Sequence, residues 1–186
     1  MFEHWKFSCS CSRCQDPTAL GTFNSGIRCT VQDCSSYLIP YRALVWQCHF
    51  CEATQPVDLI LKVIRDAESF IRNNIGGDVD CEALERTISS LQEVLHPQHY
   101  LLAQLKLVLL NKYSFVSQMT RPIKERILQL GQELAQLTIQ LDSVFSNTLG
   151  KILKILIPVW SRIADDDLKS NSISNEQFLY RKKICF

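Results

Sequence analysis

The residues best suited to chemistry are the cysteines near the start of the chain. Seven of the nine cysteines fall between positions 9 and 51, in two groups. In the second group, four residues separate Cys29 from Cys34 and two separate Cys48 from Cys51. Each closely spaced pair can bind one side of a tetrahedral ion, so the two pairs predict a four-cysteine structural zinc site with no coordination position left for catalysis. The alternative is a set of reduced structural cysteines without metal.

The first cysteine group is tighter and supplies too few ligands. Cys9, Cys11 and Cys14 offer three thiolates where a tetrahedral ion takes four ligands. The fourth ligand could come from a residue outside this chain, and the candidates within it are His4, Cys81 and Cys185. We predict zinc binding at these three cysteines. A catalytic zinc is disfavoured because no nearby glutamate or histidine pair could act as its base.

Composition excludes several classes of function. Hydrophobic residues make up 46% of the 186 positions, which excludes wholesale disorder, and the formal net charge is only +1. A near-neutral chain lacks the basic footprint of a nucleic-acid or anionic-membrane binder. The most apolar window, residues 149–163, is interrupted by Lys151, Lys154 and Pro158 and does not read as a membrane span. Clustered cysteines without a secretory signal predict an intracellular protein, in cytoplasm or nucleus.

The elements around the cysteines predict a mainly α fold with a small zinc-bound module at its start. Residues 38–41 and 45–46 suit two short strands of that module, and Thr54 suits the cap of the helix that follows. Apolar periodicity then predicts antiparallel helical hairpins of a tetratricopeptide-like kind, without a clean consensus repeat. The expected helices cover 54–75, 80–95, 98–117, 120–144 and 149–157, the last of them stopping before Pro158. The expected domains are a zinc module at 1–53, a helical domain at 54–164 and a polar linker and tail at 165–186.

Three sequence motifs resemble one protein family. Lys6-Phe7-Ser8-Cys9-Ser10-Cys11-Ser12-Arg13-Cys14, followed by residues 16–22, resembles the post-SET segment of SMYD-type SET-domain protein lysine methyltransferases. Residues 29–51 are similar to the additional cysteine module of arthropod SMYD relatives. Residues 95–102, which begin Leu95-His96-Pro97, resemble a helix start in the C-terminal helical region of the family. His96 and His99 there are expected to be hydrogen-bonded histidines at a helix boundary rather than metal ligands.

The resemblance implies roles for residues around the first cysteine group. Phe7 would stack on the adenine of S-adenosylmethionine, Trp5 would border the channel for the substrate lysine, and a cysteine of the SET core would complete the zinc site. The SET core motifs and the MYND module are missing from this sequence, so we expect the chain alone to be inactive. Alternatively, Trp5 and Phe7 only cap the zinc module, and the chain is a zinc-stabilised, non-catalytic module that binds protein partners through its helical domain.

Overall fold

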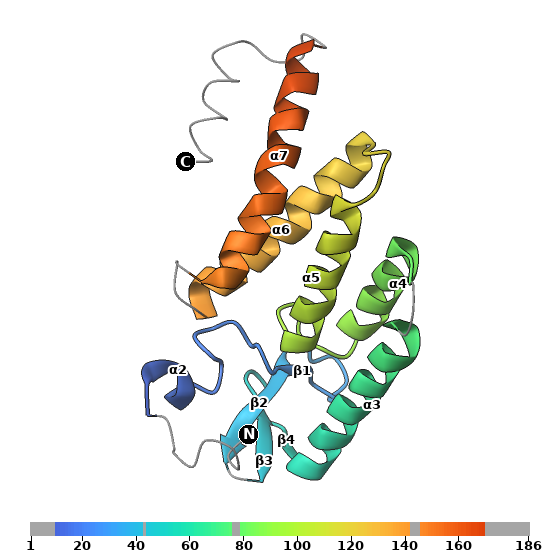
Figure 1. Cartoon of the computed structure of the whole chain (residues 1–186). Coiled ribbons are helices and arrows are strands. Elements are labelled where there is room, and N and C mark those ends of the chain that lie inside the picture. The colour runs from blue at the N-terminus through green and yellow to red at the C-terminus, as the bar shows by residue number, and fades with distance from the viewer. Residues whose placement is uncertain (1–9, 43, 76–78, 142–145, 170–186) are drawn as a thin grey trace. The chain divides into compact units, whose positions relative to one another are not determined.

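The computed structural model describes residues 10–42, 44–75, 79–141 and 146–169 (Figure 1). The chain divides into two compact units, Met1–Leu105 and Lys106–Phe186, and the boundary falls within helix α5 (Tyr100–Ser114). Helices dominate the described residues, with a short antiparallel strand module before them. The predicted fold class, mainly α behind a small strand-containing cysteine module, is therefore confirmed. The predicted domain boundaries and the tetratricopeptide-like stacking stay predictions.

The first unit contains a four-stranded antiparallel sheet whose strands pair in chain order. The strands are β1 (Ile27–Arg28), β2 (Tyr37–Arg42), β3 (Val45–Cys48) and β4 (Thr54–Pro56). Leu38 on β2 lies opposite Cys48 on β3, and both side chains are buried. The two predicted short strands are thus confirmed. Thr54 was expected to cap a helix, and this is wrong, because it pairs with Gln47 as part of the sheet.

Helices α2 (Ser12–Gln15), α3 (Val57–Ile75) and α4 (Cys81–Gln92) complete the first unit together with the start of α5. The carboxylate of Asp80 accepts a hydrogen bond of 2.7 Å from the backbone N–H of Ala83 and so caps α4. This cap satisfies a donor that the first helical turn would otherwise leave unpaired. The buried apolar side chains of this unit include Leu38, Ile60, Leu84, Ile88, Leu95 and Leu102.

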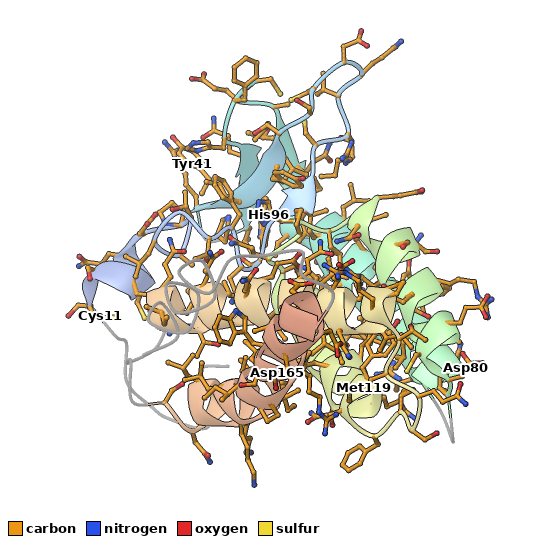
Figure 2. All side chains as sticks on the ribbon, turned by 90° about the horizontal axis from the view of Figure 1, so that it is seen from above. Cys11, Tyr41, Asp80, His96, Met119 and Asp165 are labelled. Carbon is orange, nitrogen blue, oxygen red and sulfur yellow. The ribbon has the colours of Figure 1, made fainter. Side chains whose placement is uncertain are left out.

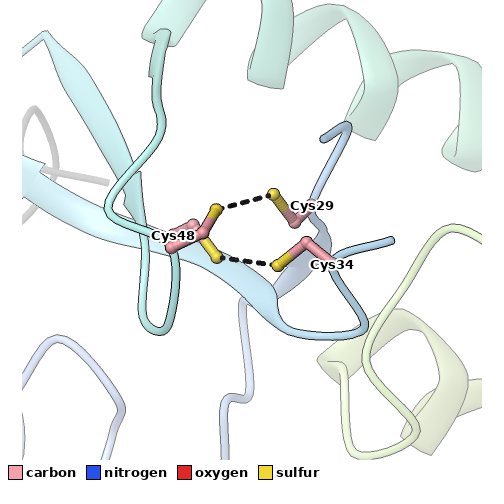
Figure 3. Close-up of side chains that lie close together, drawn as sticks. Cys29, Cys34 and Cys48 are labelled. Carbon is pink, nitrogen blue, oxygen red and sulfur yellow. Dashed lines mark hydrogen bonds between the residues drawn. The ribbon is translucent and has the colours of Figure 1, made fainter. Parts of the chain in front are cut away.

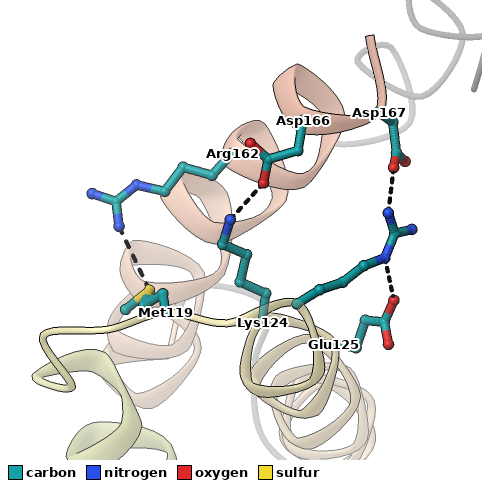
Figure 4. A network of polar contacts seen from close by, with 7 residues as sticks. Met119, Lys124, Glu125, Arg162, Asp166 and Asp167 are labelled. Atoms are coloured by element: carbon teal, nitrogen blue, oxygen red, sulfur yellow. Dashed lines mark hydrogen bonds and ion pairs between the residues drawn. The ribbon is translucent and has the colours of Figure 1, made fainter. Parts of the chain in front are cut away.

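The second unit is built on α6 (Arg121–Leu141) and α7 (Asn147–Lys169), which pack against each other along much of their length. Ion pairs join the start of α6 to the end of α7, so the two helices run antiparallel (Figure 4). The Arg121 guanidinium lies 2.8 Å from the Asp167 carboxylate, and the Lys124 ammonium lies 2.6 Å from that of Asp166. The apolar stripe predicted on α6 faces inward, with Ile127, Leu130, Leu134 and Leu137 buried.

The end of α7 differs from the sequence-based expectation. The helix continues through Pro158 and includes Asp165, Asp166 and Asp167, where the sequence predicted a stop and then a polar linker. Pro158 is exposed, so the carbonyl that loses its helical hydrogen bond can be hydrated. The aspartates hold the last turns by pairing with α6. In the described part of the chain, no helix has both the length and the apolar sequence needed to cross a bilayer.

Replacing Gly131 with alanine is expected to destabilise the second unit. A Cβ atom at this position of α6 would lie 2.2 Å from Cδ2 and 2.7 Å from Cγ of Leu156 on α7. We expect the free energy of unfolding to fall by about 1–3 kcal/mol, as for other overpacked cores. Chemical denaturation followed by circular dichroism measures this loss.

A matched glycine provides the control for Gly131→Ala. An added Cβ at Gly150 of α7 meets no atom within 4 Å, so Gly150→Ala should be neutral or stabilising by up to about 1 kcal/mol through helix propensity. Adding Leu156→Ala to Gly131→Ala should recover part of the lost stability. Equal stabilities for the two single variants would contradict close packing of α6 on α7 at Gly131.

Candidate metal centre

Four cysteines from three segments converge at one end of the sheet (Figure 3). Cys29 follows β1, Cys34 lies in the loop before β2, Cys48 ends β3, and Cys51 lies in the turn after it. All four sulfur atoms lie within 4.8 Å of one another. The Cys29 and Cys51 sulfurs are 3.6 Å apart, and those of Cys34 and Cys48 are 3.7 Å apart.

These separations suit a tetrahedral metal site. Four sulfurs bound to one zinc ion at about 2.3 Å lie about 3.8 Å from each other, which is the edge of the tetrahedron. The observed 3.6 and 3.7 Å are close to that edge and too long for disulfide bonds. The predicted four-cysteine cluster is therefore present, and its donor set and spacing fit zinc in a closed structural site.

Backbone turns position each cysteine pair. The Cys34 N–H donates to the carbonyl of Val31 at 3.2 Å, and the Glu52 N–H donates to the carbonyl of Cys48 at 3.2 Å. Asp33 and Glu52 adopt positive φ angles of 65° and 61°, which few residues other than glycine do. Each pair thus curls through one tight turn, which points both of its sulfurs inward.

The electrostatics of the cluster favour a cation. Burial raises the pKa of the Cys29 thiol to about 12. At Cys48 burial acts in the same direction, but backbone N–H groups of Cys51 and Phe50 stabilise the thiolate and bring its pKa to about 6. Cys48 is therefore the thiolate that forms first. A bound divalent cation would supply the positive charge that the other sulfurs need in order to deprotonate.

The first cysteine group is separate from this cluster. Cys11 and Cys14, at either side of the start of α2, are exposed, and Cys11 lies at the edge of the view in Figure 2. Within the described residues, the cluster of Cys29, Cys34, Cys48 and Cys51 includes neither of them, nor Cys81. Three other predicted site residues, Trp5, Phe7 and Cys9, lie outside the described residues, as do the proposed ligands His4 and Cys185. Their roles stay predictions.

The loop after α2 is a feature that sequence reasoning missed. The Asp16 carboxylate accepts hydrogen bonds from the side chain and backbone N–H of Thr18 and from the N–H of Leu20, at 2.7 to 2.9 Å. The side-chain bond from Thr18, followed by its backbone bond, lowers the pKa of this exposed carboxyl. The Asp-Pro-Thr sequence is a turn signal that could have predicted this arrangement. The loop fixes the chain directly after Cys14.

An aromatic cluster connects the cysteine module to the segment before α5. The Phe23 ring lies 5.2 Å from the rings of both His49 and His96, and the Tyr37 ring lies 4.5 Å from that of His96. Backbone bonds support the contact, since the N–H of His96 donates to the carbonyl of Gly26 at 2.9 Å. His49 was predicted to be a bystander in its cysteine turn, and its ring packs on Phe23 outside the sulfur cluster.

The histidines of the third motif have structural roles at a helix boundary, as predicted. Nδ1 of His96 accepts a hydrogen bond from the N–H of Gln98 at 3.1 Å, and Nδ1 of His99 accepts one from the N–H of Leu101 at 3.2 Å. His99 is fully buried, and its ring stacks on Tyr100 at 4.5 Å. The two histidines thus shape the turn that leads into α5.

Comparison with known proteins points to the same family as the motifs. No protein-family model matches the sequence. The chain is similar to the SET domain-containing protein SmydA-8 of Drosophila melanogaster: isoform B is 30% identical over 92 residues, which are 47% of this chain and 20% of that protein. The resemblance to SMYD-type proteins is thereby confirmed. Isoform A is 28% identical over 92 residues, covering 47% of this chain and 19% of that protein. The match spans about a fifth of the length of these curated relatives.

Proposed function

We propose that this chain is the C-terminal part of a SMYD-type protein lysine methyltransferase, made of a post-SET zinc module and a helical domain. The observation that carries this proposal is the 30% identity to SmydA-8, a protein described as SET domain-containing. The four-cysteine cluster supports it, because it occupies the segment that resembles the cysteine module of arthropod relatives. In this proposal the cluster holds a structural zinc that stabilises the sheet.

The first cysteine group would contribute to the methyl-transfer site in a complete protein. Cys9, Cys11 and Cys14 would bind a second zinc together with a cysteine of the SET core. The exposure of Cys11 and Cys14 supports this, because ligands at the surface remain accessible to a fourth ligand from elsewhere. The zinc would hold Phe7 against the adenine of S-adenosylmethionine and Trp5 beside the lysine channel.

This chain alone is expected not to transfer methyl groups. Methyl transfer to a lysine amine requires the cofactor and the neutral amine to be aligned in a narrow, water-excluding channel. Phe7 and Trp5 would form only part of the wall of that channel. A methyl-transfer assay on the purified chain, with a protein lysine substrate and S-adenosylmethionine, should therefore give no product, and a clear signal would contradict this expectation.

Cofactor binding is a more sensitive test of the proposal. Calorimetry with S-adenosylmethionine should detect weak, saturable binding to the chain, and Phe7→Ala should abolish it because the stacking surface is removed. Phe50→Ala is the matched control, since Phe50 is an aromatic residue of the other cysteine group and is 81% exposed. Binding that survives Phe7→Ala, or that is lost equally in Phe50→Ala, would contradict the assigned role of Phe7.

The alternative is a zinc-stabilised, non-catalytic module that binds protein partners through its helical domain. A groove in the second unit, bordered by the largely exposed Phe115, favours it. No cofactor binding is expected under this alternative, whereas zinc in the four-cysteine cluster is expected under both. Calorimetry therefore separates the two functions, and metal analysis does not.

A further inference from the structure

A groove of about 480 Å³ lies in the second unit. One wall is a continuous face of α7, and the other is the end of α5 with the loop that follows it. The α7 residues recur at intervals of three and one positions, which places them on the same side of the helix. They are Lys151, Lys154, Ile155, Pro158, Val159 and Arg162.

The centre of the groove is apolar. Ile155, Pro158 and Val159 contribute apolar surface from α7, and Phe115 and Met119 face them from the opposite wall. Phe115 is 86% exposed, so most of its ring remains in water. An exposed aromatic residue next to an apolar groove commonly marks a binding site, because a partner that covers it gains the free energy of burial.

The ends of the groove are positively charged. Lys151 and Lys154 lie toward one end and Arg162 toward the other, and no aspartate or glutamate lines it. Among the described residues, no ion pair is recorded for Lys151 or Lys154, and the recorded contact of Arg162 is with the sulfur of Met119 at 3.5 Å. Figure 4 shows this contact beside the paired cations of α6.

The nearby carboxylates are engaged elsewhere. Asp166 pairs with Lys124, and Asp167 pairs with Arg121, so both face α6. The groove therefore presents positive charge at both ends of an apolar floor and lacks negative groups of its own. A ligand that complements it must carry negative charge at two points with apolar groups between them.

We propose that this groove binds a short acidic peptide segment of a protein partner, with carboxylates at both ends of an apolar stretch. Along α7, Arg162 lies eight and eleven positions beyond Lys154 and Lys151, which corresponds to about 12–16 Å. An extended peptide covers that distance in about four to five residues. A nucleic acid would leave the apolar floor uncovered, and the chain has a formal net charge of only +1.

This inference does not depend on methyl transfer. It assigns a partner chemistry to the second unit, whereas the proposed cofactor contacts belong to the first cysteine group. Failure of cofactor binding would therefore leave the peptide inference standing, and failure of peptide binding would leave the cofactor proposal standing.

Fluorescence anisotropy of the full chain with a labelled synthetic peptide tests the inference. The probe carries two glutamates at each end of a leucine-phenylalanine-leucine core, and a control peptide carries lysines in place of the glutamates. The acidic probe should bind saturably and the basic peptide should not. Charge reversal of Lys151 and Lys154 to glutamate should weaken binding at least about tenfold, and Phe115→Ala should weaken it several-fold because an aromatic contact is lost.

Matched controls and competing occupants make the test decisive. Lys62→Glu with Arg65→Glu makes the same change in charge on the exposed face of α3 and should leave the affinity unchanged. Four results would overturn the inference: no binding of the acidic probe, equal losses in the two charge-reversed variants, displacement by a DNA oligonucleotide, or binding only after removal of residues 170–186. Concentration-dependent dimerisation that Phe115→Ala abolishes would also overturn it, since the occupant would then be a second copy of this chain.

Discussion

Replacing Cys48 with serine is expected to release zinc from the four-cysteine cluster and to unfold the strand module. Cys48 is 2% exposed, lies opposite Leu38 in the sheet and carries the thiolate that forms most readily. Structural zinc sites couple metal binding to folding, with apparent binding free energies of about 10–16 kcal/mol in small zinc modules. Losing one ligand of four should therefore remove more free energy than a small module can spare.

Native mass spectrometry and tryptophan fluorescence measure the two consequences of Cys48→Ser. The variant should lose one zinc, and the emission of Trp46, which lies on β3 two residues before Cys48, should shift toward that of an unfolded chain. His49→Gln is the matched control, because His49 lies in the same turn but outside the sulfur cluster. It should keep both metal and fold. A Cys48→Ser protein that retains zinc and its native emission would show that the site is wrongly assigned.

Acidification should destabilise the first unit through His99. Burial, and secondarily the nearby His96, lowers the pKa of His99 to about 4. The backbone N–H of Leu101 already donates to Nδ1, so the proton of the neutral ring resides on Nε2, which has no hydrogen-bond partner in the described structure. Protonating Nδ1 would place a donor against the N–H of Leu101 and a charge inside the core.

The sign of the pH dependence follows from this lowered pKa. In the unfolded chain His99 titrates near its ordinary pKa of about 6.5, so below that pH the unfolded state binds a proton that the folded state excludes. Stability should therefore be unaffected by His99 above about pH 6.5, fall as the pH decreases toward 4, and level off below it. The loss amounts to at most about 3 kcal/mol, from the difference between the two pKa values.

His99→Asn isolates this contribution. Asparagine can accept the hydrogen bond from the N–H of Leu101 but does not titrate. Chemical denaturation at a series of pH values should show a smaller loss of stability between pH 6.5 and 4 in this variant than in the parent chain. The comparison between proteins matters, because acid also protonates cysteine ligands in both. His49→Gln should retain the pH dependence of the parent. Identical slopes for His99→Asn and the parent would contradict the assignment.

Local spacing explains why the metal centre could be predicted from the sequence. Cys29 with Cys34, and Cys48 with Cys51, are each close enough in sequence for one turn to bring both sulfurs together. The short strands between the pairs were also visible as apolar and aromatic runs. The sequence did not reveal the aromatic cluster of Phe23 and His96 with Tyr37 and His49, because rings that meet through tertiary packing leave no local pattern.

The end of α7 shows why helix boundaries were harder to predict. A proline and three consecutive aspartates are strong local signals for ending a helix, yet α7 passes through both. The reason is tertiary: Arg121 and Lys124, more than forty positions earlier, supply the charges that Asp167 and Asp166 need. Residue spacing along one segment cannot reveal such partners. The roles of Trp5 and Phe7 rest on the family resemblance alone, since both lie outside the described residues.

X-ray absorption spectroscopy at the zinc edge of the purified full chain tests the metal centre most directly. The cluster of Cys29, Cys34, Cys48 and Cys51 predicts bound zinc with a coordination shell dominated by sulfur at about 2.3 Å. That shell should disappear, or lose one site's share of its zinc, in Cys48→Ser. A folded chain without zinc, or zinc bound mainly by nitrogen and oxygen at about 2.0–2.1 Å, would contradict the assignment.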